Sequence, residues 1–274
     1  MSEGQATRAV VLARGLGTRM RRNDDSARLD AEQAAVAATG LKAMIPVGRP
    51  FLDFVLSGLA DAGFSDACLV VGPEHDVVRE RYGGPDAPRR INVHFAVQER
   101  PLGTADAVLA ASGFVDGNPF VVLNSDNYYP VEALVALRRQ GAPSLLGFER
   151  ESLIRDGNIG PERILSFALL QTAPDGTLTK VVEKPDPEIA RELGPGALVS
   201  MNCWCFTPEI FEACRAIPVS ERGELEIPRA VQYAIDHMGM KFVVVPASGG
   251  VLDLSSRADI AAVKERLSEV EVRL

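Results

Sequence analysis

The sequence has no excess of basic residues. Its 29 Lys and Arg are outnumbered by 37 Asp and Glu, which gives a formal net charge of −8 and a pI near 5.1. A protein that follows a nucleic-acid backbone needs a basic surface, so we expect no nucleic acid among its partners. Any phosphate group would have to be bound locally, by a few lysines and arginines.

Long apolar runs are missing as well. No stretch approaches the length needed to cross a bilayer. The residues Met1-Ser2-Glu3-Gly4-Gln5 lack the charged and then apolar pattern of a signal peptide. These absences predict a cytoplasmic protein with no membrane partner, and they leave a homo-oligomer open.

Cysteines are few and show no metal-binding spacing. Cys68, Cys203, Cys205 and Cys214 form no C-x-x-C pair. Cys203 and Cys205 fall on one face of a predicted strand, with no histidine cluster nearby. We interpret these cysteines as reduced packing residues rather than metal ligands or redox groups.

The hydrophobic content, 46% of 274 residues, is enough for one large folded core. Through the first half, apolar β-rich runs alternate with amphipathic helical stretches, which predicts an α/β fold with a mostly parallel mixed sheet flanked by helices. In such a sheet, ligands bind at the carboxyl ends of the strands. The alternating segments are Ala9–Ala13, Pro50–Ala62, Ala67–Val71, Val77–Tyr82, Ile91–Ala96, Ala105–Ala111, Phe120–Leu123 and Val131–Arg139.

After Gly141 the pattern changes to longer predicted strands. We expect strands over Ile164–Gln171 and Thr177–Val182, joined by a hairpin turn at Pro174-Asp175-Gly176. The stretch Ser256–Leu274 has apolar residues at helical spacing, which predicts an amphipathic helix packed on the body of the domain.

The first candidate binding element is a glycine-bearing turn after the first strand. Gly15 and Gly17 have no Cβ, so the backbone can bring successive N–H groups close to an anion, while Thr18 and Arg19 add side-chain donors. The turn predicts a phosphate cradle, and a turn that only reverses the chain is the alternative. A dinucleotide fingerprint is excluded because Met20 occupies its third glycine position, and no G-K-S or G-K-T follows to form a P-loop.

Lys42 lies before an apolar turn that contains Pro46 and Val47. A fixed ammonium in that place suits phosphate groups. The segment Arg21–Gly40 separates Lys42 from the glycine turn, and its residues Ala31–Ala38 favour a helix. Both a flap over the phosphates and an outward helix are compatible with this segment.

In this order, these segments resemble the motifs of the sugar-1-phosphate nucleotidyltransferases, or NDP-sugar pyrophosphorylases, and among them the glucose-1-phosphate thymidylyl- and uridylyltransferases. The glycine turn resembles A-G-G-x-G-T-R, with Arg14 at the first glycine position. The segment from Lys42 resembles K-x-x-x-P-V. Residues 98–107 resemble Q-x-x-x-x-G-T-A-x-A, and Val181–Pro185 match V-x-E-K-P.

Four further segments continue the resemblance. Asp126 stands at the aspartate of the family's G-D pair, with Ser125 in place of the glycine. Val199–Pro208 resembles the strand that lines the sugar site, and Glu221–Pro228 resembles the G-E segment before a helix. Asp253 stands at the aspartate of W-x-D, although the tryptophan is missing.

The resemblance implies the Rossmann-like nucleotide-diphospho-sugar transferase fold, as a single domain over residues 1–274. It implies a nucleotide-binding half over 1–140 and a sugar-binding half over 141–274. The implied partners are a nucleoside triphosphate and a sugar-1-phosphate, which the enzyme joins to an NDP-sugar with release of pyrophosphate.

Site roles also follow from the resemblance. Gln98 offers a donor and an acceptor to a base, Glu183 can accept from sugar hydroxyls, and Lys184 can hold the sugar phosphate. Two carboxylates distant in sequence can converge on one hard cation. The implied set comprises catalytic Arg19, Lys42 and Lys184; nucleotide-binding Leu12, Ala13, Gly15, Gly17, Thr18, Gln98, Gly103 and Thr104; sugar-binding Asn124, Glu183 and Asn202; and the Mg²⁺ (magnesium) ligands Asp126 and Asp253.

Two other functions stay open at this point. One is a regulatory protein that binds a nucleotide or sugar without turnover, because Arg14, Ser125 and Ser255 replace family glycines. The other is a phosphocholine-type cytidylyltransferase, which the sugar-facing assignments of Glu183 and Asn202 disfavour.

Overall fold

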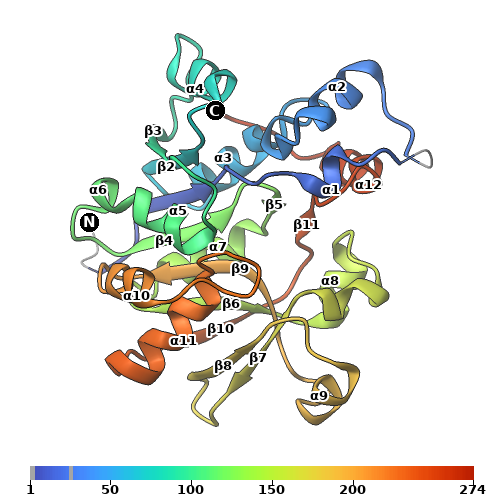
Figure 1. Cartoon of the computed structure of the whole chain (residues 1–274). Helices are drawn as coiled ribbons and strands as arrows, with labels where there is room; N and C mark the ends of the chain where they lie inside the picture. The colour runs from blue at the N-terminus through green and yellow to red at the C-terminus, as the bar shows by residue number, and fades with distance from the viewer. Residues whose placement is uncertain (1–3, 25–26) are drawn as a thin grey trace.

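A nine-stranded mixed sheet forms the centre of the computed structural model, which describes residues 4–24 and 27–274 (Figure 1). The strand order is β10-β6-β9-β4-β1-β2-β3, and β7 and β8 branch from β9. The strands are β1 (Arg8–Leu12), β2 (Asp66–Val71), β3 (Asn92–Val97), β4 (Phe120–Asn124), β6 (Ser144–Phe148), β7 (Ala168–Thr172), β8 (Leu178–Val182), β9 (Val199–Phe206) and β10 (Val243–Ala247).

The sheet has a parallel half and an antiparallel insertion. β1 pairs in parallel with β2 on one side and with β4 on the other, and β2 continues in parallel to β3. β9 then runs antiparallel between β4 and β6, while β6 pairs in parallel with β10. The chain order reverses between β1 and β4, and at such a point the connections diverge and leave a crevice for a ligand.

Helices cover both faces, so the strands can be apolar on both sides. On one face, Val10 and Val122 contact a core formed with α5, α10 and α11; on the other, Val11 and Leu123 face α3, α7 and α12. The α-helices are α1 (Thr18–Arg21), α2 (Ala31–Thr39), α3 (Phe51–Asp61), α4 (Asp76–Gly83), α5 (Thr104–Ala110), α6 (Ser112–Val115), α7 (Val131–Arg138), α8 (Arg150–Asp156), α9 (Pro187–Glu192), α10 (Ile210–Ala216), α11 (Ile227–Met238) and α12 (Asp259–Leu267).

Two predicted elements have the wrong extent. The strand expected over 164–171 begins only at Ala168, because Gly160-Pro161 starts the 3-10 helix η2 (Pro161–Ser166) and places Ile164 in the core. The helix expected over 256–274 is confined to α12. Beyond it the chain packs against α3, where the backbone N–H of Arg273 donates to Ser57 Oγ at 3.0 Å.

Other local predictions are confirmed. β7 and β8 form the expected hairpin, with Gly176 at φ 81° in its turn. Within the segment 21–40, α2 is capped by Asp30, whose side chain accepts from the N–H of Gln33 at 2.8 Å; residues 25 and 26 of that segment lie outside the described part. No helix in residues 4–24 or 27–274 combines the length and apolar character of a membrane span.

Asp53 anchors α3 to α4 through a buried carboxylate. Its side chain is fully buried and accepts from Arg49 at 2.9 Å, Arg81 at 2.7 Å and the Tyr82 hydroxyl at 2.6 Å. Burial raises the pKa of Tyr82, and the charge of Asp53 raises it further. A charge in such a place is tolerated only when it is paired and hydrogen-bonded.

Asp53→Ala should therefore lower the free energy of unfolding by about 3 kcal/mol, because two guanidinium groups and a buried hydroxyl lose a shared acceptor. Urea unfolding followed by circular dichroism measures the loss. Asp76→Ala is the matched control: it removes an exposed carboxylate 2.7 Å from Arg79 and should cost less than about 1 kcal/mol. Equal losses in the two variants would contradict a special role for Asp53.

Candidate active site

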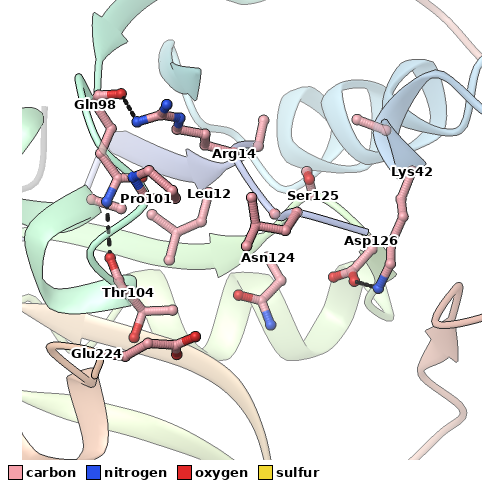
Figure 2. Close-up of a pocket in the computed structure, with 16 residues that line it drawn as sticks. Leu12, Arg14, Lys42, Gln98, Pro101, Thr104, Asn124, Ser125, Asp126 and Glu224 are labelled. Atoms are coloured by element: carbon pink, nitrogen blue, oxygen red, sulfur yellow. Dashed lines mark hydrogen bonds and ion pairs between the residues drawn. The ribbon is translucent and has the colours of Figure 1, made fainter. Parts of the chain in front are cut away.

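A pocket of about 230 Å³ opens at the carboxyl ends of β1 and β4 (Figure 2). It lies where the strand order reverses, and segments far apart in the chain meet in its wall. The lining residues are Leu12, Ala13, Arg14, Gly15, Leu16, Lys42, Ala43, Gln98, Pro101, Gly103, Thr104, Ala107, Asn124, Ser125, Asp126 and Glu224.

A second pocket of about 190 Å³ adjoins the first and shares Leu12, Thr104, Asn124 and Glu224 with it. Its other lining residues come from β4, β9, the residue after β8, the loop before α11 and the start of α11. They are Val122, Glu183, Asn202, Trp204, Arg222, Glu226, Ile227 and Pro228. The two pockets therefore form neighbouring subsites with a common wall.

Only part of the glycine turn faces the first pocket. Gly15 lines it, and among the described residues the N–H groups of Gly15 and Leu16 have no hydrogen-bond partner, which leaves them available to an anion. Gly17 instead packs against Gly40, whose carbonyl oxygen would lie 2.1 Å from an added Cβ. The N–H of Ala13 already donates to Val70 at 2.9 Å.

Thr18 and Arg19 begin the short helix α1 and are exposed. Neither lines the two pockets, although both were expected at the phosphates.

Lys42 and Asp126 meet across the first pocket. Lys42 lies on the 3-10 helix η1 (Lys42–Met44), and its Nζ is 2.8 Å from Asp126 Oδ2 (Figure 2). The carbonyl of Asp126 accepts from the N–H of Leu254 at 2.9 Å, which fixes its backbone. Both charged side chains are only about a fifth exposed (18% and 23%), so water screens the pair incompletely.

Asp253 lies beside Asp126 but behind the pocket wall. The two-stranded ribbon of β5 (Asn127–Tyr128) and β11 (Leu252–Asp253) pairs it with Asn127, whose Nδ2 donates to its carboxylate at 3.1 Å. Arg163 is 2.5 Å from its other oxygen. Burial raises the pKa of Asp253, and the negative charge of Asp126 raises it further.

The donor set is suited to a hard cation at Asp126. Carboxylate oxygens are the ligands that magnesium prefers, and the mutual repulsion of Asp126 and Asp253 would be relieved by a cation near both. Lys42 and Arg163 supply positive charge to these carboxylates in this structure. Within the described residues, no three His, Cys, Asp or Glu side chains gather in a way that could hold a metal ion, so any further ligands would come from a phosphate or water.

Gln98, Gly103 and Thr104 lie together at one end of the first pocket. Gly103 has φ 114°, and an added Cβ would lie 2.4 Å from the carbonyl oxygen of Leu225. The hydroxyl of Thr104 accepts from the N–H of Ile227 at 2.9 Å. These contacts hold residues 224–227 against the start of α5 and so build the wall common to both pockets.

Glu183 and Asn202 line the second pocket, whereas Lys184 lines neither. Glu183 is exposed by surface area, but the pocket walls surround its carboxylate; this desolvation raises its pKa, and the charge of Glu226 adds to the effect. Asn202 and Lys184 both have positive φ values, 57° and 42°, a conformation that an asparagine adopts more readily than most side chains.

Sequence reasoning did not identify several contributors to the site. Arg163 reaches Asp253 from η2, in a segment with no recognisable motif, and also pairs with Asp259 at 2.6 Å. Arg222 pairs with Glu226 at 2.7 Å in the second pocket. Among these contributors, only the segment around Glu224 could be recognised from the sequence, because it resembles the G-E motif.

Comparisons with known proteins identify the family. The family model "Nucleotidyl transferase" matches residues 35–248. The chain is 31% identical over 278 residues to glucose-1-phosphate thymidylyltransferase of Streptomyces antibioticus, covering 97% of this chain and 68% of that protein. It is 27% identical to UTP--glucose-1-phosphate uridylyltransferase AglF of Haloferax volcanii, covering 95% of this chain and 96% of that protein.

Solved structures show the same fold. A crystal structure of UDP-glucose pyrophosphorylase complexed with UDP-glucose superposes with a TM-score of 0.73 at 15% identity, covering 97% of this chain and 100% of that one. The family match spans Lys42, every strand of the main sheet except β1, and the lining of the second pocket except Leu12. β1, the glycine turn, α1 and the residues after 248, which include Asp253 and α12, lie outside it. The chain belongs to the nucleotidyl transferase family, among its sugar-1-phosphate nucleotidyltransferases.

Proposed function

We propose that this enzyme is magnesium-dependent and binds a nucleoside triphosphate in the first pocket and a sugar-1-phosphate in the second. The acceptor's phosphate oxygen attacks the α-phosphorus of the triphosphate. A new oxygen–phosphorus bond forms, the bond from the α-phosphorus to the bridging oxygen breaks, and pyrophosphate leaves. The nucleophile is already ionised, so the reaction needs no general base.

The observation that carries this proposal is the Lys42–Asp126 ion pair in the first pocket, which shares a wall with the second. An ammonium fixed in a partly buried site can move its hydrogen bonds from a carboxylate to a phosphate. The positive charge is then already in place when charge builds up on the departing pyrophosphate, so little reorganisation is needed. The free N–H groups at Gly15 and Leu16 would donate hydrogen bonds to the same phosphates.

The second pocket supplies polar groups of the kind a sugar requires. Glu183 accepts from hydroxyl groups, Asn202 can both donate and accept, and Asn124 lies where the two subsites meet. We assign Lys184 to the acceptor phosphate and Arg19 to the departing pyrophosphate, as the motifs imply. Positioning of the two substrates in line is then the main source of rate.

We assign magnesium to Asp126 and Asp253. When bound, it neutralises phosphate charge. The carboxylate of Asp126 faces the pocket, while Asn127 and Arg163 hold that of Asp253 in one orientation. The cytoplasm, where nucleoside triphosphates are available, is the compartment that we propose.

Lys42→Ala should reduce pyrophosphate release by about 100-fold or more, because it removes a preorganised cation at the phosphates. The measurement is pyrophosphate release over a panel of nucleoside triphosphates and sugar-1-phosphates. Lys264→Ala, at an exposed position on α12, is the matched control and should keep the wild-type rate. Unchanged turnover in Lys42→Ala would remove Lys42 from the mechanism, and nucleotide binding by the wild-type protein without release across the panel would favour a regulatory role.

Asp126→Ala should abolish magnesium-dependent pyrophosphate release while the protein stays folded, because the residue lies in the turn between β4 and β5 and its side chain faces the pocket rather than the core. Release is followed over a magnesium titration, and folding is checked by circular dichroism. Asp86→Ala removes an exposed carboxylate from a loop away from both pockets and serves as the control. A normal magnesium response in Asp126→Ala would exclude this ligand.

Glu183 should give the KM for the sugar-1-phosphate a dependence on pH. Both oxygens of its carboxylate accept hydroxyl hydrogen bonds when ionised, whereas protonation turns one of them into a donor. Because its pKa is raised, protonation begins at a higher pH than for an ordinary glutamate. KM should therefore rise as the pH falls through this pKa. Glu183→Gln should have a higher KM at neutral pH and lack this part of the dependence, while the ionisation of the substrate itself affects both proteins alike. Identical pH profiles would contradict the assignment.

A further inference from the structure

Arg14 is a buried cation in the wall of the first pocket. Its side chain is only 8% exposed, although it stands at a position where the resembled motif has glycine. The Nη1 group donates to the carbonyl of Gln98, and Nη2 lies 3.4 Å from Glu74 Oε2. The buried Nε–H has no partner among the described residues. Burying a donor without an acceptor costs free energy, so an acceptor on a bound ligand would stabilise this group.

The side chain spans the pocket from the glycine turn to Gln98. Figure 2 shows the guanidinium group directed toward Gln98, while the backbone of Arg14 continues into the turn. Gln98, Pro101 and Gly103 line the same end of the pocket. If the triphosphate lies at the turn, the base of the nucleotide extends along Arg14 toward Gln98.

Gln98 has only one group left for a ligand. Its Nε2 donates to the carbonyl of Gly103 at 3.0 Å and to Asp106 Oδ2 at 2.8 Å. Both partners are acceptors, so they fix which end of the amide is nitrogen. The side-chain oxygen of Gln98 accepts no hydrogen bond from the described residues. This end of the pocket therefore offers an acceptor from Gln98 and donors from Arg14.

We propose that Arg14 is a specificity-determining residue that donates to the C4 carbonyl of a pyrimidine base, while Gln98 Oε1 accepts from the ring N3–H. This proposal rests on the proposed function. C4 lies across the ring from N1, which carries the ribose, so it is the part of the base that reaches farthest from the turn. Uracil and thymine present the matching carbonyl and ring N–H.

Cytosine presents the opposite pattern at both positions. Its C4 amino group would place donors against the Arg14 donors, and its unprotonated N3 would place a lone pair against Gln98 Oε1. The ribose and triphosphate, anchored at the glycine turn, prevent the base from sliding to restore a match. Leaving buried polar groups unpaired is a strong source of discrimination.

The alternative is that Arg14 acts only as a cation for the triphosphate. UTP and CTP carry the same phosphates and differ only at C4 and N3, so this pair of ligands separates the two roles. Binding of UTP and CTP to the full-length protein with magnesium is measured by isothermal titration calorimetry. The variants are Arg14→Gly, Arg14→Lys and, as a control for lost charge, Arg89→Gly, at an exposed loop position outside both pockets.

The wild-type protein should bind UTP more tightly than CTP. Arg14→Gly should reduce this preference by about 10-fold or more, the scale of one good pair of contacts to a base. Arg14→Lys, which keeps the charge and most of the bulk but lacks the buried Nε–H, should lose much of the preference, and Arg89→Gly should keep it.

The assignment would be overturned if Arg14→Gly weakened the binding of UTP and of CTP equally. It would also be overturned if both Arg14 variants kept the preference for UTP over CTP. Either result would leave the proposed function in place. If the wild-type protein bound neither UTP nor CTP but bound a purine triphosphate, the role of Arg14 would fail and the proposed function would stand. If it bound no nucleoside triphosphate, both would fail. Arg14→Lys keeps the proposal falsifiable should the glycine variant not fold.

Discussion

The ion pair between Lys42 and Asp126 is the contact on which the rest of the site depends. It joins residues 84 positions apart, one on η1 after the segment 21–40 and one after β4. With no substrate present, each charge stabilises the other in a place where water screens poorly. The same arrangement keeps a cation beside the glycine turn. The positive charge needed for a highly charged ligand is therefore neutralised by Asp126 when no ligand is bound.

A second group of paired charges lies behind the pocket wall. Asp253 is held by Arg163 and Asn127, and Arg163 is shared with Asp259. Two carboxylates near one another would otherwise repel, and this is why the charge of Asp126 raises the pKa of Asp253. Each carboxylate therefore has its own cation, and a metal ion would change the partners of Asp126 more easily than those of the buried Asp253. Exposure to the pocket, rather than charge, distinguishes the two.

The sequence predicted those parts of the molecule that rest on short-range patterns. Apolar runs such as Phe120–Leu123 identified β4, and Gly176 identified the β7–β8 turn. Lys42, Gln98 and Glu183, which the motifs singled out, line two adjoining pockets. Contacts between distant segments were not predictable in this way: nothing near Arg163 signals Asp253, and Gly17 looked like part of the anion cradle, whereas it is required by close packing on Gly40.

The contact between Gly17 and Gly40 has a consequence for how this protein can change. An added Cβ on Gly17 would lie 2.1 Å from the carbonyl oxygen of Gly40, and one on Gly40 would lie 2.7 Å from that of Leu16. Arg21 reinforces the junction by donating to Thr39 at 2.9 Å. The end of α2 must therefore meet the glycine turn at this point, because neither glycine leaves room for a larger residue. The contact with the end of α2 thus holds the backbone of the glycine turn in its conformation before any ligand binds.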